Sequence, residues 1–119
     1  MHELSVCHAL ITQLETLAKA QAANRILDVT LGIGPLSGIE PRLLEQAYPL
    51  AAAGTVAEHA QLTIQVSPVR VHCITCGAES EASVSRLVCA QCGDWHTRLI
   101  SGDELLLLHV ELTRETECV

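Results

Sequence analysis

Aromatic residues are almost absent from this 119-residue chain, which has no Phe, one Trp and one Tyr. Because 49% of its residues are nevertheless hydrophobic, we expect a core built from aliphatic side chains. No apolar run reaches the roughly 20 residues that a membrane-spanning helix needs, and the first residues lack the basic stretch of a secretion signal. We therefore expect a cytoplasmic protein with no membrane contact, in which the cysteines stay reduced.

Basic residues are also scarce, with seven Lys and Arg against fourteen Asp and Glu and a formal net charge of −7. In residues 68–98 the three arginines are balanced by three acidic residues. A protein that binds nucleic acid needs a basic surface to neutralise phosphates. We therefore expect no nucleic-acid partner.

Motifs for catalysis are missing as well. The chain contains neither a Gly-x-x-x-x-Gly-Lys phosphate loop nor a Gly-x-Ser-x-Gly nucleophile motif. We therefore expect that the protein is not an enzyme.

The cysteines, in contrast, are arranged in a specific pattern. Cys73 and Cys76 form one Cys-x2-Cys pair, and Cys89 and Cys92 form a second pair after twelve intervening residues. A glycine, which favours tight turns with positive φ, follows each pair. Four thiolates at this spacing are typical of a structural Zn²⁺ site with bonds of about 2.3 Å. The pattern predicts a zinc ribbon over residues 68–98, and disulfides or an iron site are the less favoured alternatives.

The remaining chain has the periodicity of a small α+β fold. We expect a mixed three-stranded sheet covered by two helices, with the four-cysteine ribbon inserted between the second and third strands. These last two strands should pair antiparallel, since they flank the ribbon. Residues 1–67 and 99–119 would then form one α/β domain. The expected helices are 4–23 and 41–53, and the expected strands are 27–33, 62–66 and 106–112.

The chain begins Met1-His2-Glu3, which carries a second candidate metal site. A terminal amine, a neighbouring imidazole and backbone amides can form fused chelate rings with nitrogen donors in one plane. This geometry suits Ni²⁺ or Cu²⁺ better than tetrahedral Zn²⁺. A frayed, solvated terminus is the alternative interpretation.

Several segments together resemble the HypA/HybF family, the nickel metallochaperones that mature [NiFe]-hydrogenases. The similar segments are Met1–Ser5, Leu36–Pro41, Ala47-Tyr48 leading to Gly54-Thr55, and the cysteine quartet. The resemblance implies a nickel-binding α/β domain and a zinc ribbon. It also implies two partners, which are the nickel-insertion GTPase HypB and the hydrogenase large subunit that receives the metal.

The same resemblance assigns roles to single residues. It makes His2 and Glu3 nickel-binding residues, and Glu40 stands where the family often has an acidic residue near that site, although a solvated loop carboxylate is a comparable alternative. Aliphatic helices of this kind also allow two chains to associate as a homodimer. The zinc ligands implied by the resemblance are Cys73, Cys76, Cys89 and Cys92.

Two other functions fit parts of the pattern. A zinc-ribbon adaptor would bind only protein partners, and its nickel affinity would not depend on His2. A rubredoxin-like electron carrier would hold iron in the quartet and would be coloured.

Overall fold

The computed structural model describes residues 3–114, which form two helices and six strands. The predicted helices and the three predicted strands are all present, with slightly different bounds. Three short strands were not predicted, because each has too few residues to show a clear alternation of apolar and polar side chains. In chain order the elements are α1 (Glu3–Ala20), β1 (Arg25–Ile33), α2 (Pro41–Ala52), β2 (Gln61–Val66), β3 (Arg70–Cys73), β4 (Glu79–Glu81), β5 (Thr97–Ser101) and β6 (Leu105–Thr113).

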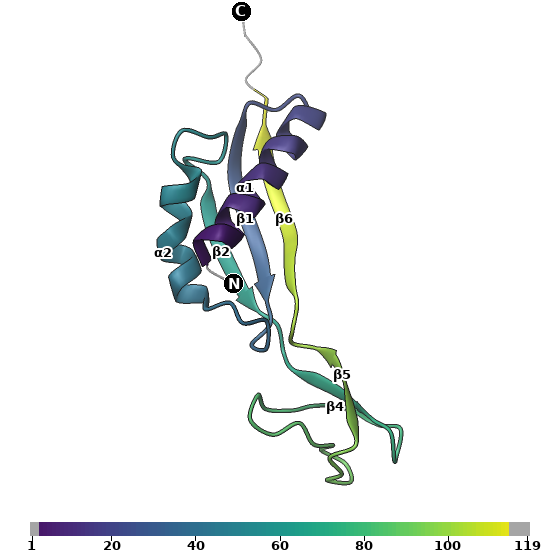
Figure 1. Ribbon diagram of the computed structural model, residues 1–119. Helices are drawn as coiled ribbons and strands as arrows, with labels where there is room; N and C mark the ends of the chain where they lie inside the picture. The colour runs from purple at the N-terminus through teal and green to yellow at the C-terminus, as the bar shows by residue number, and fades with distance from the viewer. Residues whose placement is uncertain (1–2, 115–119) are drawn as a thin grey trace, which may run out of the picture. The chain divides into compact units, whose positions relative to one another are not determined.

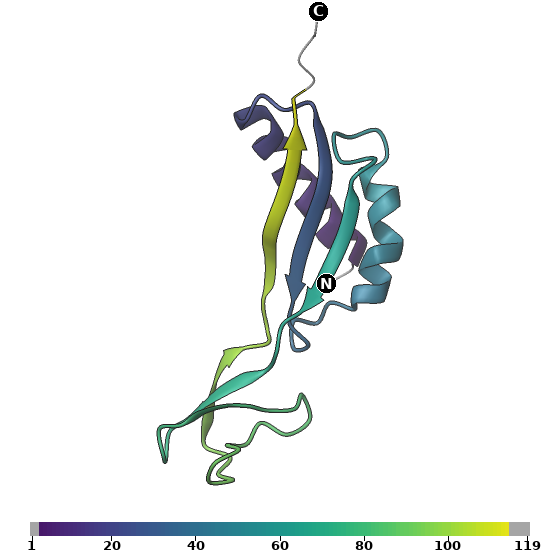
Figure 2. The same cartoon turned by 180° about the vertical axis from the view of Figure 1, so that it is seen from behind.

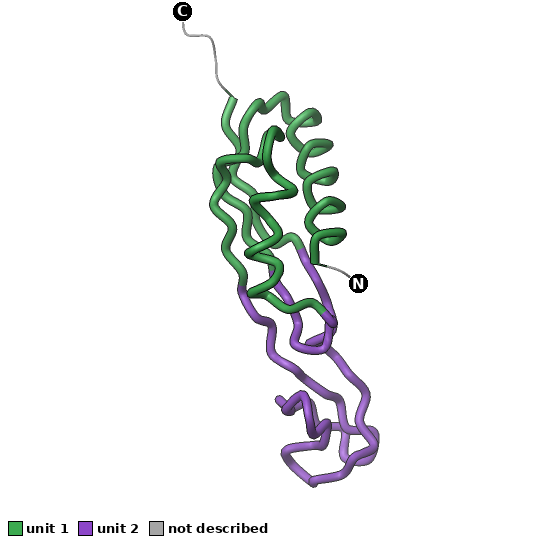
Figure 3. The backbone as a smooth tube through the Cα atoms, turned by 60° about the vertical axis from the view of Figure 1, so that its left-hand side comes forward, with its two compact units in different colours: residues 1–31, 39–64, 107–119 green, residues 32–38, 65–106 purple. Residues whose placement is uncertain are grey.

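The chain divides into two compact units, which Figure 3 shows in different colours. Unit 1 comprises residues 1–31, 39–64 and 107–119, and unit 2 comprises residues 32–38 and 65–106. The assignment of a nickel-binding function to residues 1–67 with 99–119, and of a zinc-binding function to residues 68–98, stays a prediction.

Unit 1 has the aliphatic core that the composition predicts. Apolar residues recur along α1 at helical spacing, and those on one side of the helix are buried. Figures 1 and 2 show that α1 and α2 cover the same face of the sheet. Leu14, Ile26, Val29 and Leu44 have no exposed surface, so the layer between helices and sheet gives this unit a core of its own.

The larger sheet has the strand order β2-β1-β6. β1 runs parallel to β2 and antiparallel to β6 (Figure 2), so the predicted mixed three-stranded sheet is confirmed. The predicted antiparallel pairing of the second and third strands, β2 and β6, is wrong. These two strands lie on opposite sides of β1 because β1 carries the fully buried residues, whereas β2 has none, and the more buried strand occupies the centre.

α2 starts as the sequence predicts, with a proline in its first turn. The side chain of Glu40 caps the helix and accepts a hydrogen bond from Arg42 N at 3.4 Å. Pro49 lies inside the last turn of α2. The backbone keeps its helical hydrogen bond there, because Ala53 N donates to Pro49 O at 3.2 Å. The helix ends at Ala52, one residue before the end that the sequence predicts.

Unit 2 contains a second three-stranded sheet with the order β4-β3-β5. Both pairings are antiparallel, and they place His72 opposite Glu79 on one side and opposite Arg98 on the other. Val71 and Cys73 point to the buried side of the central strand. The sheet therefore brings the end of β3, where the first cysteine lies, beside the start of β5.

A close approach of two backbone segments in unit 2 requires a glycine at position 34. Gly34 N donates to Glu104 O at 2.8 Å, and Leu36 N donates to Gly102 O at 2.6 Å. A Cβ added at Gly34 would lie 2.1 Å from Gly102 O. This steric clash could be relieved only if the two backbone segments moved apart.

We predict that Gly34→Ala lowers the free energy of unfolding by about 3 kcal/mol, because overpacking against backbone is costly. Gly38→Ala is the matched control, since a Cβ there meets no atom within 4 Å although φ is +82°. It should cost only about 1 kcal/mol through its left-handed backbone. Urea unfolding of both metal-loaded variants measures the difference, and equal losses would contradict the close approach.

Candidate metal centre

The four predicted cysteine ligands lie together at one end of unit 2. Cys73 ends β3, Cys76 lies in the turn before β4, and Cys89 and Cys92 lie in the loop before β5. All four sulfur atoms are within 4.8 Å of one another. The Sγ–Sγ distances are 3.6 Å for Cys73–Cys92 and 3.6 Å for Cys76–Cys89. Bonds of about 2.3 Å in a tetrahedron require sulfur separations of roughly 3.8 Å, so the arrangement fits a tetrahedral ion.

Each Cys-x2-Cys pair sits in the same kind of tight turn, which we call a knuckle. The first knuckle is residues 73–78 and the second is residues 89–94. Gly77 and Gly93 adopt φ of 79° and 78°, which confirms that these turns need positive φ. Gly77 N donates to Cys73 O, and Gly93 N donates to Cys89 O, both at 2.9 Å. The two turns therefore repeat one backbone conformation.

Backbone N–H groups in the knuckles point at sulfur. Cys76 N donates to Cys73 Sγ at 3.4 Å, and Cys92 N donates to Cys89 Sγ at 3.4 Å. The N–H groups of Cys92 and Gln91 lower the pKa of the Cys89 thiol to about 6. For Cys92, the Asp94 N–H acts to lower the pKa, but the neighbouring Cys73 sulfur and burial outweigh it and raise the pKa to about 12. Four thiols this close cannot all ionise alone, and a bound cation would remove that limit.

The donor set also narrows the choice of ion. Four thiolates in a tetrahedron are typical of zinc or of iron, and they are a poor site for hard cations that prefer oxygen ligands. Within residues 3–114 this quartet is the one group whose spacing could hold a metal ion. No side chain other than cysteine belongs to it.

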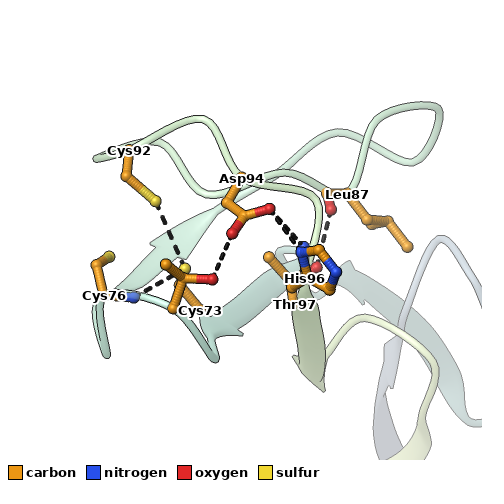
Figure 4. Close-up of polar contacts among 8 residues, drawn as sticks. Cys73, Cys76, Leu87, Cys92, Asp94, His96 and Thr97 are labelled. Atoms are coloured by element: carbon orange, nitrogen blue, oxygen red, sulfur yellow. Dashed lines mark hydrogen bonds and ion pairs between the residues drawn. The ribbon is translucent and has the colours of Figure 1, made fainter.

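Polar side chains beside the quartet form a network that the sequence did not indicate. Asp94 accepts hydrogen bonds from the hydroxyl of Thr75 and from His96, whose Nδ1 lies 2.8 Å from Oδ1 (Figure 4). The hydrogen bond from Thr75 has the largest effect, and together with those from His96 it holds the pKa of Asp94 well below its usual range. The ring of His96 also stacks on Trp95, with centroids 3.8 Å apart. A pattern search for cysteine and histidine ligands cannot identify Asp94 or Thr75, because neither would touch the metal.

The second candidate site is described only in part. Met1 and His2 lie outside the described residues. Glu3 is in the first turn of α1, and its Oε2 accepts a hydrogen bond from Glu40 N at 3.2 Å. The fold thus brings together two acidic residues that are 37 positions apart, at the end of α1 from which the chain start emerges.

Cys7 lies one helical turn after Glu3 but is fully buried. Its thiol donates to Leu44 O at 3.6 Å. Burial and the nearby Glu3 carboxylate raise the pKa of this thiol, so it has little thiolate character. This geometry indicates that Cys7 is an inert core residue.

The fold and the sulfur cluster define a class of small α+β metal-binding proteins with a four-cysteine ribbon. Among the described residues no helix is long and apolar enough to cross a membrane. Residues 1–112 match the family model described as "Hydrogenase/urease nickel incorporation, metallochaperone, hypA". The chain therefore belongs to the HypA family, as the sequence resemblance indicated.

Individual relatives agree with this assignment. The hydrogenase maturation factor HypA of Nitrosospira multiformis is 49% identical over 112 residues, which cover 94% of this chain and 97% of the relative. That of Aquifex aeolicus is 39% identical with the same coverage. The solution structure of the nickel metallochaperone HypA from Helicobacter pylori is similar with a TM-score of 0.72 and 30% identity, covering 97% of this chain and all of that one.

Proposed function

We propose that this protein is a nickel metallochaperone that binds Ni²⁺ at its N-terminus and helps to insert it into the large subunit of a [NiFe]-hydrogenase. The donors would be the terminal amine, the imidazole of His2 and nearby backbone nitrogens, with Glu3 contributing to the site. Planar nitrogen coordination suits Ni²⁺. A site at a chain end also holds the ion through few ligands, so few bonds must break when the ion is passed to another protein.

The observation that carries this proposal is the position of Glu3 beside Glu40, together with membership of the HypA family. The Glu3 carboxylate accepts a hydrogen bond from the backbone N–H of Glu40, and both residues are acidic, so they would add negative charge to the proposed site. Their side chains are partly or fully exposed, so an arriving ion and a receiving protein could both reach them. Glu40 is therefore a further candidate residue for this site.

We infer that the cysteine quartet holds Zn²⁺ in a structural role. The four ligands complete a tetrahedral shell, and a closed thiolate site has no open position for a substrate. This supports a protein that is not an enzyme. A colourless protein with one zinc per chain would exclude the iron-containing electron carrier, whose Fe–thiolate site absorbs visible light.

The proposed partners are proteins, namely the GTPase HypB and the hydrogenase large subunit, and the proposed location is the cytoplasm. Four thiolates around Zn²⁺ would add a charge of about −2 to a ribbon whose other charges cancel. An anionic surface of this kind disfavours nucleic acid. Association into a homodimer is also a proposal, and the oligomeric state measured by light scattering would test it.

The delivery function can be tested with purified proteins. The nickel-loaded protein is mixed with the nickel-free precursor of the hydrogenase large subunit and with the GTPase and GTP, and nickel in the re-isolated precursor is measured. We expect transfer from the wild type and little transfer from His2→Ala at the same total nickel concentration. Equal transfer from both would contradict delivery through His2, and no transfer from either would favour the zinc-ribbon adaptor.

A further inference from the structure

The second knuckle carries an acidic residue that its own turn does not need. Cys73 N donates to Ala78 O at 2.8 Å in the first knuckle, and Cys89 N donates to Asp94 O at 2.9 Å in the second. Asp94 is therefore the counterpart of Ala78. Since alanine suffices in the first turn, the carboxylate of Asp94 must be explained by contacts outside the second turn.

The side chain of Asp94 reaches into the first knuckle. Its Oδ2 accepts a hydrogen bond from the hydroxyl of Thr75, which lies between the two cysteines of that knuckle. Its Oδ1 accepts from His96, both from the backbone N at 3.2 Å and from Nδ1 at 2.8 Å. Both oxygens are thus engaged, and His96 holds the carboxylate in the orientation that meets Thr75.

We propose that Asp94 is a positioning residue that ties the two knuckles together and so retains the metal ion. Each knuckle supplies two of the four sulfur ligands, so the site can open when the knuckles separate. Hydrogen bonds inside a single knuckle cannot oppose that movement, whereas the bond between Thr75 and Asp94 crosses from one to the other. A hydrogen bond with an ionised acceptor is also about twice as strong as a neutral one.

This inference rests on the proposed occupation of the quartet by Zn²⁺. The direct test is the zinc affinity of full-length Asp94→Ala, measured by competition with a chromophoric chelator. Ala78 shows that alanine is compatible with a knuckle turn, so the turn itself should persist. We expect an affinity roughly 10-fold to 100-fold lower than that of the wild type, the loss expected when a hydrogen bond to a charged group is removed.

A double-mutant cycle separates the proposed tie from a general loss of stability. Thr75→Val removes the hydroxyl and keeps the shape of the side chain. If the two residues act through their shared hydrogen bond, the double variant should lose no more affinity than Asp94→Ala alone. Additive losses would overturn the proposal. Asp94→Asn retains an acceptor for Thr75 and should lose less affinity than Asp94→Ala.

Two controls complete the experiment. Glu81→Ala removes an exposed carboxylate from β4 of the same ribbon and should leave zinc affinity unchanged. The Co²⁺-substituted variants should keep the absorption bands of a four-thiolate site, because no ligand is altered. If the wild type contains no zinc, the proposed metal content is wrong; if it contains zinc that Asp94→Ala holds equally tightly, only the role of Asp94 is overturned.

Discussion

Cys73→Ser should abolish stoichiometric zinc binding and unfold the ribbon while leaving unit 1 folded. The four sulfurs are the main reason for residues 73–97 to adopt their loops, since the only buried hydrophobic residues in this stretch are Cys73 and Cys89. Metal binding of about 10–16 kcal/mol supports comparable sites at neutral pH. Removal of one ligand should therefore cost more free energy than the folded ribbon has in excess over its unfolded state. Unit 1 keeps its aliphatic core and should stay compact.

Zinc analysis and NMR spectra of the backbone amides measure both parts of this prediction. Cys7→Ser is the matched control, because it alters a buried cysteine of α1 that lies outside the quartet. That variant should keep its zinc and its ribbon signals. Dispersed ribbon signals in metal-free Cys73→Ser would show that the ribbon folds without the ion, and the structural role of zinc would then be wrong.

His2→Ala should remove most of the nickel affinity without changing zinc content or fold. The imidazole closes one of the fused chelate rings, and its loss should weaken Ni²⁺ binding by about 100-fold, which corresponds to about 2.7 kcal/mol. Affinity in the wild type should also fall as the pH drops through the imidazole range near 6.5, because protons compete for the same nitrogen. The affinity is measured by calorimetric titration at pH 7.5 and 6.0.

His8→Ala provides the matched control for this variant. His8 is an exposed histidine on α1, near in sequence but without a place in the proposed chelate. Its replacement should leave nickel affinity unchanged. A loss in His8→Ala equal to that in His2→Ala would indicate that His2 and His8 bind nickel jointly, and the assignment to the terminal chelate would be wrong.

The sequence predicted those features that depend on local spacing. The cysteine pairs and the glycines at 77 and 93 specify their turns within six residues, so their conformation follows from the pattern alone. The two helices and the strands β1, β2 and β6 were likewise visible as periodic runs of apolar residues. For the same reason the insertion of the ribbon between β2 and β6 could be predicted.

Features that depend on contacts between distant residues were not predictable in this way. β1 lies at the centre because it buries more apolar surface than its neighbours. This comparison depends on the whole sheet and not on one strand. The bond between Thr75 and Asp94 and the approach of Gly34 to Gly102 also join segments that the sequence separates. Glu40 was recognised through family resemblance, whereas its contact with Glu3 became visible only in the folded chain.

The most direct test of nickel binding at the terminus is a calorimetric titration with Ni²⁺ of one protein before and after removal of a cleavable N-terminal extension. The extension converts the terminal amine to an amide and leaves every side chain in place, so it removes one donor and nothing else. We predict tight binding of one Ni²⁺ per chain after cleavage and an affinity at least about 100-fold lower before it. Equal affinities in the two forms would contradict the account.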